Sequence, residues 1–185
     1  MGRLQHRTAP GCTYFVTTKA WGNRSLFQVP ENAEIVIEVL LRHRANGAYL
    51  LHEFVLMPDH MHLLLTPGPT TTLEKAMQLI KGGTSYEIHK RREHRMEIWQ
   101  PGFHEQTVRN AEDFRRKAEY IRMNPVEAKL AETSERWPYS SARSGFKLDE
   151  APWHSASGAK ALEGVLGVLS GLKPRPPSGS THRSR

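Results

Sequence analysis

The alternation of hydrophobic and polar positions predicts four β-strands. The segments are residues 12–20, 48–56, 60–66 and 103–109, which are rich in β-branched, aromatic or aliphatic side chains. Only residues 57–59 separate the second segment from the third. Because so short a link can only join antiparallel neighbours, we expect a β-hairpin there.

Three other segments carry apolar residues at helical spacing. Residues 31–47 end in an Asn-Gly pair, which is a good helix stop. Residues 70–94 open with threonines suited to capping, and a glycine pair inside them indicates a kink or a close contact. Residues 110–124 begin with Asn110 as N-cap, and Pro125 marks the end of this helix or a break in it.

The order of these elements is β-α-β-β-α-β followed by a helix. It predicts an α+β, ferredoxin-like fold, in which an antiparallel sheet carries its helices on one face and a C-terminal helix bearing Tyr120 follows. We expect this domain to span residues 1–148. Residues 149–185 are a Gly/Ser/Pro-rich, basic extension, and the composition of the last dozen residues predicts disorder.

Composition narrows the functional classes. The 185-residue chain has a net charge of +7 and a pI near 9.8, which favours a polyanionic partner such as nucleic acid over a merely basic surface. Cys12 is the single cysteine, so no intramolecular disulfide can form. No apolar run approaches the length of a membrane span, and the N-terminus lacks a signal-peptide core. We therefore expect a cytoplasmic, nucleoid-associated protein without a membrane partner.

Two histidines at the start of the third strand are the strongest chemical signal. Side chains alternate along a strand, so His60 and His62 share one face and can converge on one metal ion. The alternative is a pair of partly exposed surface histidines. A third ligand must come from elsewhere, and Tyr120 and Asn124 lie one turn apart on one helical face. Taken alone, a helical tyrosine such as Tyr120 more often packs in the core, and an asparagine such as Asn124 more often lies at the end of a helix.

Three sequence blocks resemble a known family. VLMPDHMHLLL (residues 55–65) resembles the His-hydrophobic-His block of the HUH single-tyrosine transposases. EYIRMNPVEAKLAE (residues 119–132) resembles the tyrosine helix of one branch, the REP-associated tyrosine transposases, and WQPGFHEQTVRNAEDF (residues 99–114) is similar to that branch as well. The resemblance runs from about residue 14 to residue 142.

The resemblance implies a metal-dependent endonuclease and strand transferase that acts on single-stranded DNA. His60 and His62 would hold a divalent metal, Mg²⁺ or Mn²⁺, and Asn124 would complete its site. Tyr120 would attack a DNA phosphate, leaving a 5′-phosphotyrosine and a free 3′-hydroxyl. Targets in this branch are short palindromic repeats folded as hairpins. Whether the protein acts as a monomer or a homodimer stays open.

Basic residues offer candidates for binding the DNA backbone. As a rule such runs are solvated helix faces, but two basic helices flanking a nuclease site favour a backbone track. Candidates for base stacking are Trp99, Trp137 and Tyr139, although core packing is the commoner role of tryptophan. The candidates for contact with phosphates are Lys81, Arg91, Arg92, Arg95, Arg115, Arg116, Lys117 and Arg122.

Two other functions remain compatible with the residues. One is a hairpin DNA-binding protein without catalysis, and the other is a small metal-binding protein with no DNA role. Within the enzyme hypothesis, Tyr86 is the only serious competitor of Tyr120, because it too is expected on a helix and could face the metal.

Overall fold

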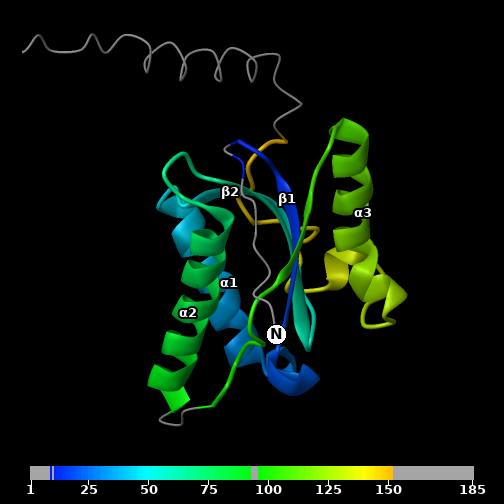
Figure 1. The fold of residues 1–185 in the computed structure, drawn as a ribbon. Coiled ribbons are helices and arrows are strands. Elements are labelled where there is room, and N and C mark those ends of the chain that lie inside the picture. The colour runs from blue at the N-terminus through cyan, green and yellow to red at the C-terminus, as the bar shows by residue number, and fades with distance from the viewer. Residues whose placement is uncertain (1–8, 10, 93–95, 152–185) are drawn as a thin grey trace, which may run out of the picture. The chain divides into compact units, whose positions relative to one another are not determined.

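A four-stranded antiparallel sheet forms the centre of the fold (Figure 1). The computed structural model describes residues 9, 11–92 and 96–151, with the side chain of Arg92 left out. The strands are β1 (Tyr14–Lys19), β2 (Tyr49–Leu56), β3 (His60–Pro67) and β4 (His104–Thr107). The α-helices are α1 (Pro30–Ala45), α2 (Leu73–Arg92) and α3 (Ala111–Glu127), and short 3₁₀ turns lie at Trp21–Asn23, Leu26–Gln28 and Ser134–Arg136.

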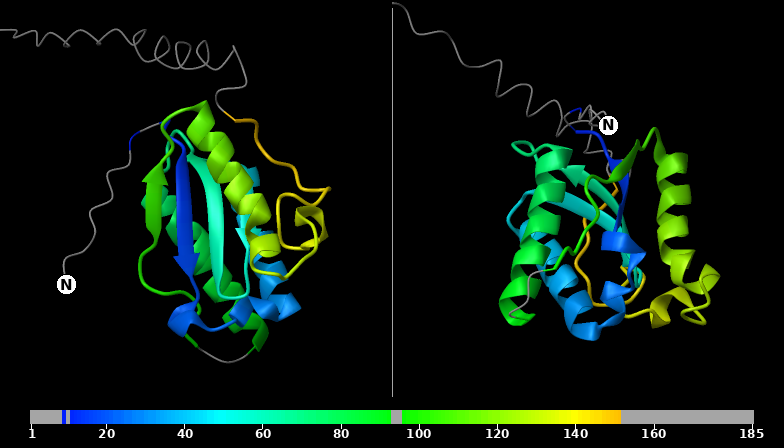
Figure 2. Two further views of the ribbon diagram at one scale, coloured as in Figure 1. Left: turned by 90° about the vertical axis from the view of Figure 1, so that its right-hand side faces the viewer. Right: turned by 60° about the horizontal axis from the view of Figure 1, so that its bottom comes forward.

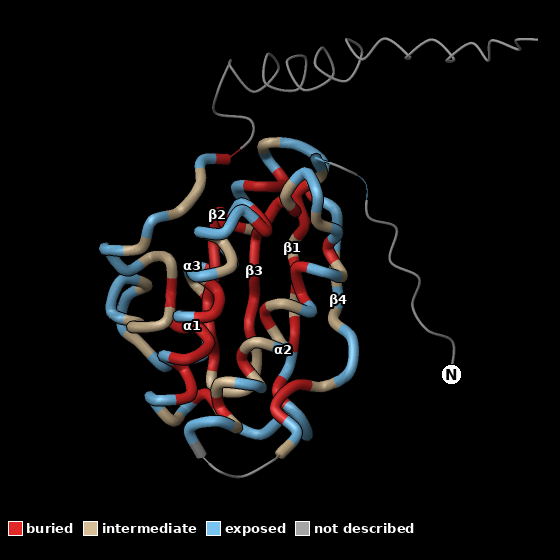
Figure 3. The backbone as a smooth tube through the Cα atoms, turned by 90° about the vertical axis from the view of Figure 1, so that its left-hand side faces the viewer, coloured by how far each residue is buried: buried red, intermediate tan, exposed pale blue. Residues whose placement is uncertain are grey.

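The strands lie in the order β2-β3-β1-β4, and every neighbouring pair is antiparallel. Together with the order of elements along the chain, this is the ferredoxin-like arrangement, so the predicted fold class is confirmed. β3 is an inner strand and is buried along nearly its whole length (Figure 3). The strand that carries the two histidines is therefore held by neighbours on both sides.

The helices form two layers on opposite faces of the sheet (Figures 1 and 2). α1 and α2 cover one face and enclose the main apolar core, to which the sheet contributes Val16, Met61 and Leu63 among others. α3 packs against β2 and β3 from the other side. Side chains that alternate with the core residues, such as Phe15 and His62, consequently point toward α3.

The ends of α3 follow from its sequence. Asn110 accepts a hydrogen bond from the backbone N–H of Asp113 (2.9 Å), and the Asp113 carboxylate accepts one from the N–H of Arg109 (3.1 Å). This reciprocal cap confirms Asn110 as the predicted N-cap. Pro125 neither ends nor breaks the helix, which continues to Glu127. The proline lies in the last turn, where the loss of one backbone donor affects a single intrahelical bond.

The glycine pair in α2 marks a close contact, since the helix runs through it without a break. A Cβ at Gly83 would lie 2.9 Å from Cγ1 of Val39 in α1, whereas a Cβ at Gly82 would meet nothing within 4 Å. Gly83 thus lets the two helices approach each other closely.

The outer edge of β2 is covered by the segment that follows α3. The N–H of Leu56 donates to the carbonyl of Tyr139 (2.9 Å), and the N–H of Ser141 donates to that of Phe54 (2.9 Å). Asp149 closes the segment, because its N–H donates to Leu51 O (2.8 Å). The segment between Tyr139 and Asp149 therefore protects an edge that would otherwise present unpaired backbone groups.

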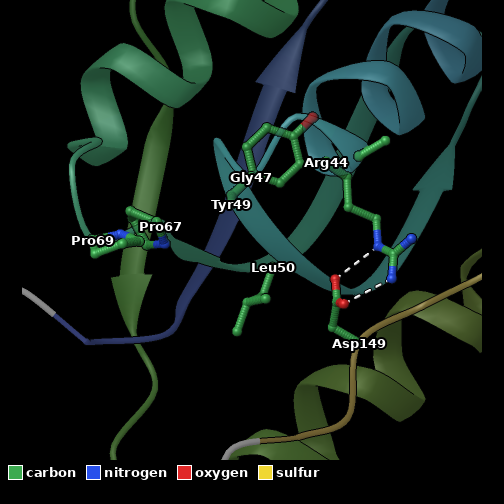
Figure 4. Close-up of a pocket in the computed structure, with 9 residues that line it drawn as sticks. Arg44, Gly47, Tyr49, Leu50, Pro67, Pro69 and Asp149 are labelled. Atoms are coloured by element: carbon green, nitrogen blue, oxygen red, sulfur yellow. Dashed lines mark hydrogen bonds and ion pairs between the residues drawn. The ribbon is translucent and has the colours of Figure 1, made fainter. Parts of the chain in front are cut away.

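Asp149 also anchors this segment through its side chain. Its carboxylate accepts two hydrogen bonds of 2.7 Å from Arg44 at the end of α1, beside a small surface pocket (Figure 4). The described residues up to Glu150 belong to one compact unit. The predicted disorder at the C-terminus lies outside the described residues. No helix among those described combines the length and the apolar character that a membrane span requires.

Candidate nuclease site

The two histidines of β3 lie side by side on the face that α3 covers. Their ring centroids are 4.8 Å apart, with the ring planes at 76°. His62 is 5% exposed, and His60 is half-buried at the start of the strand. The alternative of two partly exposed surface histidines therefore does not hold for His62.

A carboxylate orients His60. Nδ1 of His60 lies 2.6 Å from Oδ1 of Asp59 in the turn between β2 and β3. An ionised carboxylate can only accept a hydrogen bond, so Nδ1 of His60 carries the proton that is shared with it. When the imidazole of His60 is neutral, its Nε2 therefore keeps a lone pair. A carboxylate placed behind a histidine in this way is the usual arrangement around metal-ligating imidazoles.

His62 is held in its neutral form. Burial, followed by the charge of His60, lowers the pKa of His62 to about 3. Its Nδ1 lies 2.9 Å from the hydroxyl oxygen of Thr17 on β1. Near neutral pH this imidazole is therefore uncharged, as a metal ligand must be.

Tyr120 reaches the histidines from α3. Its side chain is 45% exposed, and its ring lies edge-on to His62, with 5.3 Å between centroids and 69° between planes. It makes a second edge contact with Phe15 of β1, at 5.9 Å and 73°. The structure thus brings the predicted nucleophile and the buried histidine together, and the phenol remains accessible to a substrate.

Asn124 lies one helical turn beyond Tyr120 on the buried side of α3 and is 9% exposed. Its side-chain amide has no hydrogen-bond partner among the described residues, so its oxygen is available as a ligand. No group of three or more His, Cys, Asp or Glu side chains in the described ranges could hold a metal. A metal at the histidine pair would accordingly need an oxygen of another kind. By their chemistry, two neutral imidazoles and an amide oxygen such as that of Asn124 are donors that suit a divalent transition metal.

The basic residues of α3 lie on the same side of the sheet as the histidines. Arg116 is largely exposed and contacts Asp113 (3.1 Å), while Arg115 is exposed and donates to the carbonyl of Ala111 (3.2 Å). Lys117 is more engaged: its ammonium lies 2.8 Å from Oε1 of Gln106. Arg115 and Arg116 are therefore the more accessible cations of this helix.

Arg122 forms an ion pair with Glu53 of β2, whose carboxylate also accepts a hydrogen bond from Ser141 (2.6 Å). The side chain of Glu53 is 6% exposed and that of Arg122 is 45% exposed. This pair links α3 to the sheet, so the charge of Arg122 is largely balanced by Glu53 and is less available to a DNA phosphate.

The basic residues of α2 do not flank the site. α2 covers the opposite face of the sheet from α3, so the predicted track formed by both helices is wrong in its geometry. Lys81 donates to the carbonyls of Gln100 (2.8 Å) and Gly102, and burial lowers its pKa. Arg91 pairs with Glu38 of α1 (3.1 Å). The side chain of Arg92 and all of Arg95 lie outside the described residues.

Two aromatic residues that the sequence suggested for base stacking or for nucleophilic attack do not lie at the histidine pair. Trp99 is 6% exposed and packs against Phe27 with 4.6 Å between centroids, so the stacking role considered for it is wrong. Tyr86 is 64% exposed on α2. Because α2 covers the face of the sheet opposite to the one that carries the histidines, Tyr86 does not face the candidate metal site.

Three residues that contact the histidines were not predicted from the sequence. Asp59 directly precedes His60, so its position next to a candidate metal ligand could have indicated its role. Phe15 and Thr17 belong to β1, and the register places Thr17 opposite His62. That register depends on long-range pairing, which no local pattern reveals.

Comparison with known proteins identifies the family. The family described as "Transposase IS200 like" matches residues 14–124, a range that includes both histidines, Tyr120 and Asn124. This chain belongs to the IS200-like transposases. The resemblance seen in the sequence is thereby confirmed, and the chain is placed among enzymes that act on DNA.

This IS200-like transposase has relatives in two well-known bacteria. It is 26% identical over 147 residues to the REP-associated tyrosine transposase of Escherichia coli K12. The match covers 76% of this chain and 86% of the relative. It is 30% identical over 107 residues to a Haemophilus influenzae protein provisionally assigned to the same group, covering 52% of this chain and 61% of that protein.

Its fold resembles that of a solved REP-associated tyrosine transposase bound to a REP hairpin. The TM-score is 0.65 at 23% sequence identity, and the match covers 82% of this chain and 92% of the other. At this identity the likeness establishes the fold.

Proposed function

We propose that this transposase is a metal-dependent endonuclease and strand transferase for single-stranded DNA, with hairpin-forming palindromic repeats as its targets. The observation that carries the proposal is the contact between the exposed phenol of Tyr120 and the buried, neutral imidazole of His62. A nucleophile from one element and a metal ligand from another meet there at one accessible point. The REP hairpin bound by the structural relative supports the choice of target.

Each residue has a defined task in this proposal. The phenolic oxygen of Tyr120 attacks phosphorus, and the bond from phosphorus to the 3′-oxygen breaks. The phenolic proton leaves to solvent and the 3′-oxygen takes up a proton, so the products are a 5′-phosphotyrosine and a 3′-hydroxyl. Attack by a 3′-hydroxyl on the phosphotyrosine reverses the step and joins two strands. Arg115 and Arg116 would hold the DNA backbone beside the site.

The metal would be held by Nε2 of His60, the lone pair of His62 and the amide oxygen of Asn124. When bound, a divalent ion supplies Lewis-acid polarisation of the phosphate and stabilises developing negative charge. The protein's own contribution is to keep His62 neutral by burial and to fix the ring of His60 through Asp59. Histidine ligands favour Mn²⁺ over Mg²⁺.

The substitution Tyr120→Phe tests the proposal, because it removes the attacking oxygen and keeps the ring. Hairpin-bearing single strands are labelled at the 3′ end or at the 5′ end, incubated with protein and Mn²⁺, and separated on a denaturing gel. The wild-type protein should form a covalent adduct that carries the 3′ label only, since the downstream fragment keeps the phosphate. The adduct should be absent from the Phe variant and from reactions with chelator.

Tyr86→Phe is the matched control, because Tyr86 is an exposed helical tyrosine on the other face of the sheet. It should form adduct like the wild type. Adduct formation by Tyr120→Phe would contradict the assignment of the nucleophile. Hairpin binding without any adduct in the wild type would favour a non-catalytic DNA-binding protein. Metal binding without salt-dependent DNA binding would favour a metal-binding protein with no DNA role.

A further inference from the structure

Phe15 takes part in the candidate site without any polar group. It lies on β1, on the face that α3 covers, and its ring is stacked on that of His62 with 5.4 Å between centroids and 20° between planes. The planes of the two rings are therefore nearly parallel. One ring can bind a metal, whereas the other has no ligand atom.

The ring of Tyr120 makes edge contacts with both of these rings. Its plane makes 73° with Phe15 and 69° with His62, at centroid distances of 5.9 Å and 5.3 Å. Edge contacts of this kind are directional, because the positive edge of one ring meets the negative face of the other. Contact with two rings at once restricts the side-chain torsions of Tyr120, and hence the direction of its hydroxyl, more than contact with either ring alone.

The same Phe15 ring also receives a cation from α3. Nζ of Lys117 lies 5.2 Å from the ring centroid, which is within the range of a cation–π contact. Lys117 and Tyr120 are three residues apart and so lie on the same side of the helix. Phe15 thus contacts the nucleophile, one metal-ligand candidate and one cation, which belong to two different elements.

We propose that Phe15 is a positioning residue for the attack by Tyr120. Its ring and that of His62 both contact the phenol, so Phe15 helps to fix the orientation of Tyr120, and it also contacts the ammonium of Lys117 on the same side of α3. The proposal rests on the proposed function, since it assigns Phe15 a part in the same reaction. Misplacement of a reacting group by about 1 Å costs roughly a hundredfold in rate, so a residue that fixes a torsion can matter as much as one that touches the substrate.

The test compares three variants of the full chain. Phe15→Leu removes the ring and keeps an apolar side chain, and Phe15→Tyr keeps the ring. Phe114→Leu is the matched control, because Phe114 is another buried aromatic of α3, and one of its ring contacts is with His52 of β2, at 5.5 Å. Each variant is assayed for DNA affinity and for the single-turnover rate of adduct formation with saturating hairpin DNA and Mn²⁺.

Phe15→Leu should lower the single-turnover rate by roughly ten- to a hundredfold, with DNA affinity changed by no more than about twofold. Phe15→Tyr should restore the rate, with the adduct still mapped to Tyr120, and Phe114→Leu should react like the wild type. A general loss of packing would instead affect both leucine variants. It would also lower DNA affinity together with the rate.

A second readout needs neither metal nor DNA. In protein with ¹³C-labelled tyrosine rings, the Tyr120 signal is assigned by its absence from Tyr120→Phe, and its shift reports the neighbouring aromatic rings. Phe15→Leu should move that signal toward the position of the exposed Tyr86, and Phe114→Leu should leave it in place.

Three results would overturn the positioning role. They are an unchanged Tyr120 signal in Phe15→Leu, a wild-type rate in that variant, and a failure of Phe15→Tyr to restore the rate. If the wild-type protein itself forms no adduct, the proposed function fails, and the role of Phe15 fails with it. The two failures are therefore told apart by the wild-type reaction.

Discussion

Asp59 illustrates how a residue can affect the proposed metal site without being one of its proposed ligands. It lies in the turn before β3, and its carboxylate holds Nδ1 of His60 at 2.6 Å. We expect Asp59→Asn to weaken Mn²⁺ binding by about 10- to 100-fold, because the imidazole loses the partner that fixes its tautomer and raises its basicity. Titration calorimetry with Mn²⁺ in the absence of DNA measures this directly.

Glu132→Gln is a suitable control for the removal of one negative charge, since Glu132 is exposed beyond the end of α3. It should bind Mn²⁺ like the wild-type protein. Equal Mn²⁺ affinity in Asp59→Asn and the wild type would show that His60 is not a ligand, or that its orientation does not depend on the carboxylate.

At this scale the sequence predicts the functional residues better than their partners. Alternation along a strand is enough to place His60 and His62 on one face, and helical spacing is enough to pair Tyr120 with Asn124. What the sequence leaves open is the packing that makes His62 neutral. That packing comes from Phe15 and from other residues far away in the chain, through a register that only the folded sheet determines.

The contact between α1 and α2 gives a prediction at the scale of elements. Alanine at Gly82 should raise the free energy of unfolding by about 0.5–1 kcal/mol, because alanine favours the helix and its Cβ meets open space. Alanine at Gly83 should be less stable than alanine at Gly82 by about 1–3 kcal/mol, because its Cβ would overlap Val39 in a packed interface. Urea unfolding of both variants at one pH measures the difference.

Each glycine serves as the control for the other, since both belong to one helix and receive the same methyl group. Similar stability of the two alanine variants would mean that α1 and α2 can separate at no cost. The close approach at Gly83 would then have no role in stability.

Elements and layers differ in how well a sequence predicts them. Caps, turn residues and periodicity are local, and they suffice for the order of strands and helices and for the start of α3 at its Asn110 cap. The position of α2 relative to α3 is not local. Lys81 and Arg91 are used in contacts with a loop and with α1, and nothing in their basic run distinguishes such contacts from contacts with DNA.

For the molecule as a whole, the two layers predict which basic surface meets DNA. Binding of single strands should weaken with salt, with a log–log slope of about 0.7 for each phosphate contact. Replacing Arg115 and Arg116 by alanine should reduce that slope, because both lie on the face that carries the histidines. Fluorescence anisotropy with labelled hairpin DNA across a salt series measures the slope.

Arg91→Ala removes a charge from the opposite face and should leave the slope unchanged. A slope that falls for Arg91→Ala and stays constant for the double variant of α3 would place the DNA on the α1 and α2 layer. That outcome would separate the DNA-binding surface from the candidate nuclease site.

The extension after the folded unit gives a further prediction. A chain that ends at Glu150 should still form adduct, because the proposed ligands and nucleophile all lie before that point. A chain that ends at Leu148 should be less stable by about 1–3 kcal/mol, because it lacks Asp149 and leaves Arg44 without that partner. Urea unfolding and the gel assay on both chains test this. Loss of adduct from a folded chain that ends at Glu150 would assign the extension a part in catalysis.

The cover over β2 has a consequence for the order in which the chain is synthesised. All four strands have left the ribosome well before Tyr139, yet the outer edge of β2 gains its partners only when the segment between Tyr139 and Asp149 emerges. Until then, a nascent chain with a complete sheet leaves the outer edge of β2 unpaired, and that edge can pair with a strand of another chain. In a chain that folds as it is synthesised, we therefore expect this edge to close after the sheet has formed, and a ribosome that stalls before the segment emerges should leave a chain prone to aggregation.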